Sequence, residues 1–151
     1  MKLQKNTLLA LYSVLEFAGR PGAQLSAAEI AGKYRMSPHH LAKVLRTLGR
    51  AGLVRAARGA RGGYRFTGNP RRVTLMDIIG MFEDISVPKS GSARRSTRRA
   101  KAEVGAAAFE VEDAFGVVLA EIDEIAKATF RSITLETMLK LVERRRGSRA
   151  G

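Results

Sequence analysis

Hydrophobic residues recur with helical spacing between residues 37 and 50. The apolar positions, spaced i, i+3, i+4 and i+7, are Leu41, Val44, Leu45 and Leu48. This spacing predicts an amphipathic helix with one buried stripe, and Ser37 and Pro38 suit its N-cap and its first turn. The opposite side holds no acidic residue, and its polar positions are His39, Lys43, Arg46 and Arg50. A helix with such an outward face suits the major groove of DNA, where phosphates flank the base edges.

A short hairpin is predicted after this helix. Gly52 suits the left-handed position that follows many helices, and Leu53 and Val54 are predicted to begin the first of two strands. The tip between them, RGARGG at residues 58–63, holds two arginines, and Tyr64 and Phe66 return on one face. Arginines on such a tip can enter a narrow minor groove, so the hairpin is interpreted as the wing of a winged helix. An ordinary hairpin loop is the alternative, whereas a phosphate-binding P-loop is excluded because no Lys-Ser/Thr pair follows Gly63.

Two further helices are predicted before residue 37. The first has helical spacing at Leu8, Leu11, Tyr12, Leu15 and Ala18, and glycine and proline at residues 19–22 end it. A capping box of Ser26 and Glu29 starts the second, which runs to about residue 34. A short turn between this helix and the basic one is typical of a helix-turn-helix. Because such spacing also occurs in proteins that do not bind DNA, the basic wing and the missing acids are what favour DNA here.

The second half of the chain predicts three more helices. Thr74 caps a short one that runs to about residue 82, and residues 86–103 are arginine-rich with almost nothing to bury, which is typical of a mobile linker. A phosphate contact by this linker is the alternative. The next helix has apolar positions that alternate steps of four and three, namely Val104, Ala108, Val111, Phe115, Val118, Ile122, Ile125 and Thr129. This heptad seam favours a long helix packed against a second copy of itself. A last helix is expected from Thr134 to residue 146, with Leu135, Met138, Leu139 and Val142 inward.

The fold class that follows is mainly α with a small β wing. We expect a winged helix-turn-helix domain at residues 1–83, a flexible basic loop at 84–103, the long dimerisation helix and C-terminal helix at 104–146, and a frayed tail at 147–151.

Charge divides along the chain in the same way. The 151 residues hold 27 Lys and Arg against 14 Asp and Glu, a net charge of +13. Residues 1–73 hold 14 basic and 2 acidic side chains, which gives +12, whereas residues 104–143 hold 3 and 8, which gives −5. A polyanion partner on the N-terminal side alone is the simplest interpretation.

Several classes of function are excluded or disfavoured. The chain has no cysteine, so it forms no disulfide and no thiolate metal site. Its two histidines, His39 and His40, are sequence neighbours that point to different sides of a helix, which disfavours a metal site. No apolar run is long enough to cross a membrane, so a cytoplasmic protein is expected. The sequence shows neither paired carboxylates nor the spacing of a nucleophile and its base, which disfavours an enzyme.

The motifs SPHHLAKVLRTLGRAGLV, RGARGGYRF, VTLMDII and ITLETML together resemble the Rrf2 family of bacterial winged-helix transcriptional regulators. The resemblance implies a homodimer, joined by its long helices, that binds an inverted-repeat operator. By position it implies DNA contacts in the recognition helix, residues 37–50, from Ser37, His39, His40, Lys43 and Arg46. In the wing it implies contacts from Arg58 and Arg61, supported by Gly59, Gly62, Gly63 and Tyr64. Many relatives hold an iron–sulfur cluster on three cysteines in the loop that here spans residues 87–102. Because this chain has no cysteine, no such cofactor is expected.

The leading hypothesis is a cluster-free repressor that binds double-stranded DNA as a homodimer. Phosphate contacts are assigned to Lys5, Arg46, Arg50 and Arg65, and base selection to His39, Lys43 and Arg58. A regulator controlled by a protein partner or a small effector, bound between the wing domain and the long helix, is the first alternative. A non-specific nucleic-acid binder is the second.

Overall fold

The computed structural model describes residues 3–59, 62–83 and 106–151 of the chain. The predicted basic loop at residues 84–103, together with Val104 and Arg61, lies outside these ranges. The chain forms two compact units, of which the first combines Met1–Glu83 with Phe130–Gly151 and the second is Asp84–Thr129. We describe each unit by itself.

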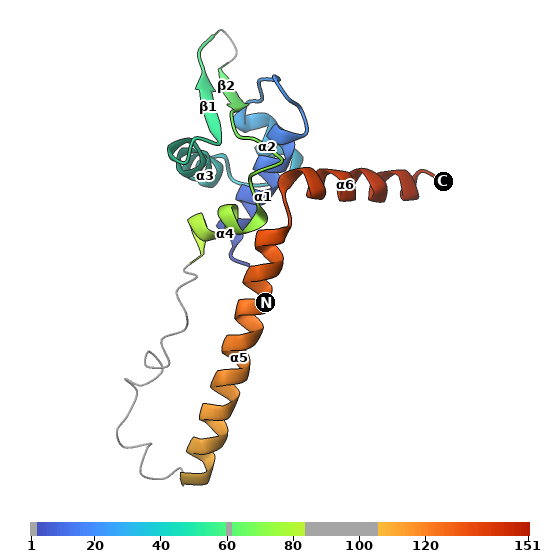
Figure 1. Ribbon diagram of the computed structural model, residues 1–151. Helices are drawn as coiled ribbons and strands as arrows, with labels where there is room; N and C mark the ends of the chain where they lie inside the picture. The colour runs from blue at the N-terminus through green and yellow to red at the C-terminus, as the bar shows by residue number, and fades with distance from the viewer. Residues whose placement is uncertain (1–2, 60–61, 84–105) are drawn as a thin grey trace. The chain divides into compact units, whose positions relative to one another are not determined.

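The first unit is built from short helices and one hairpin (Figure 1). The helices before the hairpin are α1 (Lys5–Ala18), α2 (Ala27–Lys33) and α3 (Pro38–Arg50). The antiparallel strands β1 (Val54–Ala57) and β2 (Gly63–Phe66) follow, and then α4 (Leu75–Phe82). The order of these elements, with a hairpin directly after the second helix of a helix-turn-helix pair, is that of a winged helix-turn-helix. This confirms the predicted fold class.

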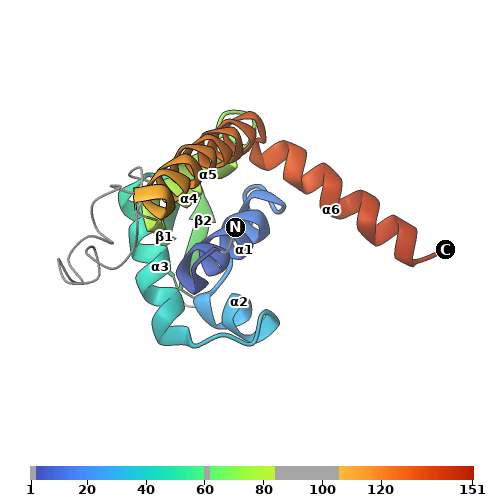
Figure 2. The same cartoon turned by 90° about the horizontal axis from the view of Figure 1, so that it is seen from below.

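The apolar stripe predicted for α3 forms the centre of the core. Leu41, Leu45 and Leu48 are completely buried, and Val44 nearly so. Full burial of an aliphatic side chain contributes about 1.5–3 kcal/mol, so this stripe strongly fixes which side of α3 faces outward. In both views α1 lies between α3 and the C-terminal helix (Figures 1 and 2).

The buried face of α1 differs from the predicted one. Val14 and Phe17 are buried, with exposed fractions of 0% and 1%, whereas Tyr12 of the predicted stripe is 40% exposed. The other predicted positions Leu8, Leu11 and Leu15 are only half-buried, and of that set Ala18 alone is buried. The physical reason is that α1 is apolar nearly all round, so its spacing fits two neighbouring stripes equally well.

Two hydroxyl residues inside the buried face of α1 also obscured the pattern. Thr7 and Ser13 are fully buried. Ser13 donates to the carbonyl of Leu9 at 2.7 Å and Thr7 donates to the Glu83 carboxylate. Because each hydroxyl has a hydrogen-bond partner, its burial carries little penalty.

The C-terminal helix α6 (Leu135–Arg149) belongs to the first unit. A short antiparallel bridge between Thr74 and Thr134 holds it there, since the N–H of Leu75 bonds the carbonyl of Ile133 and that of Leu135 bonds the carbonyl of Val73, both at 2.9 Å. The helix continues to Arg149, three residues beyond the end expected at 146. Arg146 and Arg149 stand in its last turn, where the helix dipole favours positive charge.

The second unit contains most of α5 (Ala106–Ser132). Its large apolar side chains are exposed, among them Val111, Phe115, Val118, Ile122 and Ile125 of the predicted seam. Ala108 is exposed as well. The described residues include no helix long and apolar enough to span a lipid bilayer.

Candidate nucleic-acid interface

The outward face of α3 is the first part of the candidate site. His39, Lys43, Arg46 and Arg50 are exposed on the side of α3 opposite the buried leucines, and His40 is exposed at the edge of that side. The two histidine rings lie 6.3 Å apart at their centroids. None of the three cations forms an ion pair within the described ranges of the chain, so their charges face solvent uncompensated.

The N-terminus of α3 is partly as expected. Ser37 occupies the N-cap position and Pro38 the first helical position, but the Ser37 hydroxyl makes no capping hydrogen bond. The first backbone N–H groups of α3 therefore donate no hydrogen bond to that hydroxyl. A DNA phosphate could accept from them, since helix N-termini suit anions.

A carboxylate at the base of the helix-turn-helix positions α3. Glu16 of α1 accepts hydrogen bonds from Lys33 and from the Tyr34 hydroxyl, and it also forms an ion pair with Arg20 at 3.7 Å. Tyr34 in turn stacks on Tyr12 with ring centroids 4.9 Å apart. These contacts tie the end of α2 to α1, immediately before the turn that leads into α3.

The protonation of this pair is well defined. Burial alone would raise the pKa of Glu16, but hydrogen bonds from Lys33 and Tyr34 outweigh it and lower that pKa below its usual value. Burial raises the pKa of Tyr34, and its hydrogen bond to the Glu16 carboxylate raises it further. Tyr34 therefore stays a neutral donor and Glu16 a charged acceptor near neutral pH.

The wing is the second part of the candidate site. Arg58 and Gly59 are exposed at its tip, and Arg61 cannot be placed because it lies outside the described residues. Gly62 has φ +35°, which side chains rarely adopt. Gly59 and Gly62 thus adopt the backbone conformations expected of a glycine-rich turn.

Gly63 has a packing role that the sequence did not indicate. The N–H groups of Leu25 and Tyr64 bond each other's carbonyls at 2.9 and 2.8 Å, so residue 25 adds a one-residue bridge to the wing. A Cβ on Gly63 would lie 2.8 Å from the Leu25 carbonyl oxygen. Gly63 and Tyr64 thus anchor the wing on the segment before α2, which supports their expected role as scaffolding.

A further arginine on the wing was missed by the sequence analysis. Arg55 of β1 lies directly opposite Arg65 of β2 in the antiparallel register, and both are exposed. Strand alternation could have found it, because Val54 is buried and the next side chain must point outward.

Lys5, the remaining predicted contact, is exposed at the start of α1. That end of the helix is held by the Glu83 carboxylate, which accepts from the N–H of Gln4 at 2.6 Å. Among the described residues Lys5 forms no ion pair with α3 or the wing, and its assignment to the interface stays a prediction.

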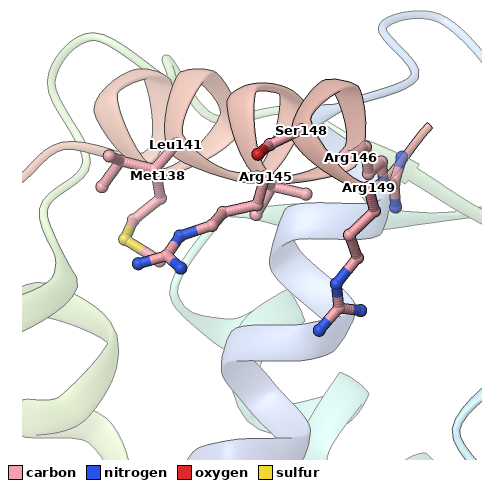
Figure 3. A pocket seen from close by; sticks show the side chains of 7 residues that line it. Met138, Leu141, Arg145, Arg146, Ser148 and Arg149 are labelled. Atoms are coloured by element: carbon pink, nitrogen blue, oxygen red, sulfur yellow. The ribbon is translucent and has the colours of Figure 1, made fainter. Parts of the chain in front are cut away.

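A hollow of about 510 Å³ lies along α6. Arg145, Arg149 and Met138 point into it (Figure 3). Its other lining residues are Leu141, Val142, Arg146 and Ser148. Because α6 and α3 lie on opposite sides of α1 in both views, the hollow is separate from the candidate interface (Figures 1 and 2).

The site contains no recognisable metal centre. Among the residues that the structure describes, no three His, Asp or Glu side chains gather closely enough to hold a metal ion. Iron–sulfur clusters are bound mainly by cysteine thiolates, and the sequence has no cysteine. The residues present therefore do not fit such a cluster.

The fold and the exposed basic helix define a winged helix-turn-helix transcription regulator. The chain belongs to the Rrf2 family, described as an iron-dependent transcriptional regulator, whose pattern it matches over residues 3–141. It is 46% identical over 146 residues to a protein named as the HTH-type transcriptional regulator BadM from Rhodopseudomonas palustris, covering 97% of this chain and 86% of that protein.

Solved structures agree with this assignment. CymR, the global cysteine regulator of B. subtilis, superposes with a TM-score of 0.70 at 27% identity and covers 93% of this chain and 98% of its own. IscR of T. potens has the same fold, with a TM-score of 0.63 at 23% identity and coverage of 96% and 90%. The family resemblance and the winged-helix fold predicted from the sequence are thereby confirmed.

Proposed function

We propose that this protein is a DNA-binding repressor that occupies an inverted-repeat operator as a homodimer. The observation that carries the proposal is the exposed face of α3, which is cationic and lies beside a hairpin with outward arginines. No acidic residue occurs between Glu29 and Asp77 in the sequence, so nothing within this stretch repels a phosphate backbone. Occupation of a promoter by such a protein blocks polymerase.

The proposed DNA contacts are assigned from the position of each residue and from its chemistry. His39, His40 and Lys43 stand in the first two turns of α3, the part of a recognition helix that contacts base edges. Arg46 and Arg50 lie one and two turns further on, and with Arg65 of the wing they are assigned to phosphates. Lysine and histidine donate to the acceptors that guanine and adenine present in the major groove. Arg58 at the wing tip is assigned to the minor groove.

The homodimer is supported by α5. Its exposed side chains include Phe115 at 64% and Ile125 at 62%, and large contiguous apolar surfaces mark interaction sites. The spacing of the seam suits a second copy of the same helix. Two copies would carry two recognition helices, which suits a two-fold symmetric operator.

Selection of binding sites from random duplex DNA, followed by gel-shift titration of the enriched duplex and a scrambled one, tests this proposal. We expect an enriched sequence with two symmetric half-sites and an affinity well above that for the scrambled duplex. If no motif is enriched, or if the enriched and the scrambled duplex bind with equal affinity, the non-specific nucleic-acid binder is favoured and the repressor is refuted.

The hollow on α6 favours a second candidate, a regulator whose DNA binding is controlled by an effector. Arg145 and Arg149 would hold an anionic group, and Met138 and Leu141 an apolar body. Titration with octanoate, using 1-octanol as the uncharged control, tests the hollow directly. A change in melting temperature with octanoate alone, lost in Arg145→Gln, is expected; equal responses to both compounds would exclude it.

A further inference from the structure

The wing carries two arginines in a position that costs stability. Arg55 and Arg65 are exact partners in the antiparallel register. Directly opposed residues on one face have Cβ atoms about 5 Å apart, and like charges in such a pair destabilise a sheet. Each side chain is exposed, and neither forms an ion pair in the described part of the chain.

The neighbouring residues do not offset this repulsion. Glu29 and Asp77 are the acidic residues nearest in sequence to the hairpin. The other residue of β1 on the face of Arg55 is Ala57, which is uncharged, and so is Gly63, its partner on β2. The hairpin has only two strands plus the bridge to Leu25, so it has little pairing with which to absorb the cost.

We infer that Arg55 and Arg65 together form a clamp for a single DNA phosphate. Two guanidinium groups side by side match the oxygens of one phosphodiester, because each can donate two hydrogen bonds. The bound phosphate would replace their mutual repulsion with two attractions. Since β1 also packs against α3, this clamp would fix the depth at which the recognition helix enters its groove. The inference rests on the proposed function and adds Arg55, a residue without a role until now, to the interface.

The test measures the salt dependence of duplex binding in the full-length protein. Each phosphate that a protein neutralises contributes about 0.9 to the slope of log K against log salt. If the two arginines share one phosphate, the double variant Arg55→Gln/Arg65→Gln lowers the slope by about 0.9. The matched control is Arg131→Gln/Arg144→Gln, which removes the same charge from exposed positions on α5 and α6 and should leave the slope unchanged.

The thermal unfolding of the DNA-free protein supplies the second readout. Removing either charge relieves the repulsion, so Arg55→Gln and Arg65→Gln should each raise the melting temperature while the double variant weakens DNA binding. If the two arginines served only the stability of the wing, the substitutions would instead lower both the melting temperature and the affinity for DNA.

Four results would overturn the inference. A slope lowered by about 1.8 would mean two separate phosphates, and an unchanged slope would mean none. Stabilisation of the wild type by inorganic phosphate, lost in the double variant without any change in slope, would assign the pair to a free anion. A wild type whose duplex binding does not depend on salt would refute the proposed function as well, which the other three outcomes leave intact.

Discussion

Replacing Arg46 and Arg50 by glutamine isolates the contribution of α3 to phosphate binding. Both side chains are exposed, and neither forms an ion pair among the described residues. Glutamine has a helix propensity close to that of arginine, so α3 should keep its structure. Arg50 is the one basic residue in the last turn of α3, and its removal should cost only about 0.3–1 kcal/mol of helix-dipole stabilisation.

The expected effect on binding follows from counterion release. Two lost phosphate contacts lower the slope of log K against log salt by about 1.8. Between about 50 mM and about 200 mM salt, the wild type should therefore lose about 12-fold more affinity than the double variant. Fluorescence anisotropy with a labelled duplex at four or five salt concentrations measures both slopes.

The charge-matched variant Arg131→Gln/Arg144→Gln serves as the control, because it removes two exposed cations that lie outside α3 and the wing. Equal slopes for the wild type and the α3 double variant would refute the assignment of these arginines. A slope lowered as much by the control would show that net charge, rather than position on α3, governs binding.

Three further predictions concern stability and assembly. Phe17→Ala should cost about 3–5 kcal/mol in urea unfolding, because its ring is 1% exposed and packs edge-on against Tyr64; a loss below 1 kcal/mol would contradict the assignment of the buried face of α1. If the proposed homodimer forms through α5, Phe115→Asp should convert it to a monomer in analytical ultracentrifugation without unfolding the first unit; an unchanged dimer would refute that interface. Hydrogen bonds from Thr7 and from the Gln4 backbone lower the pKa of Glu83 below its ordinary 4.5. These hydrogen bonds therefore stabilise the folded protein above that pH, and the stabilisation is lost as the pH falls through the lowered pKa. Glu83→Gln should therefore flatten the acid limb of the stability–pH curve, and an identical acid limb would argue against this contact.

The buried face of α3 could be predicted because its apolar residues all fall on one side of the helix. Its cations occupy the opposite side, so no other face could be buried. The capping boxes at Ser26 and Thr74 were equally readable, and both are present.

Other features carried no local signal. In α1 the apolar residues outnumber the buried positions, so tertiary packing chose between two stripes. The bridge between Leu25 and Tyr64 joins segments about forty residues apart through backbone groups alone, and side-chain patterns do not encode it. The close approach at Gly63 follows from that bridge and could not be foreseen without it.

Methylation interference on the selected duplex tests the central claim most directly. Guanine N7 lies in the major groove and adenine N3 in the minor groove. If α3 enters the major groove in each of two symmetric half-sites, methylation of guanine N7 at positions about one helical turn apart should block binding. Binding that is insensitive to guanine N7 methylation throughout the site would contradict the account.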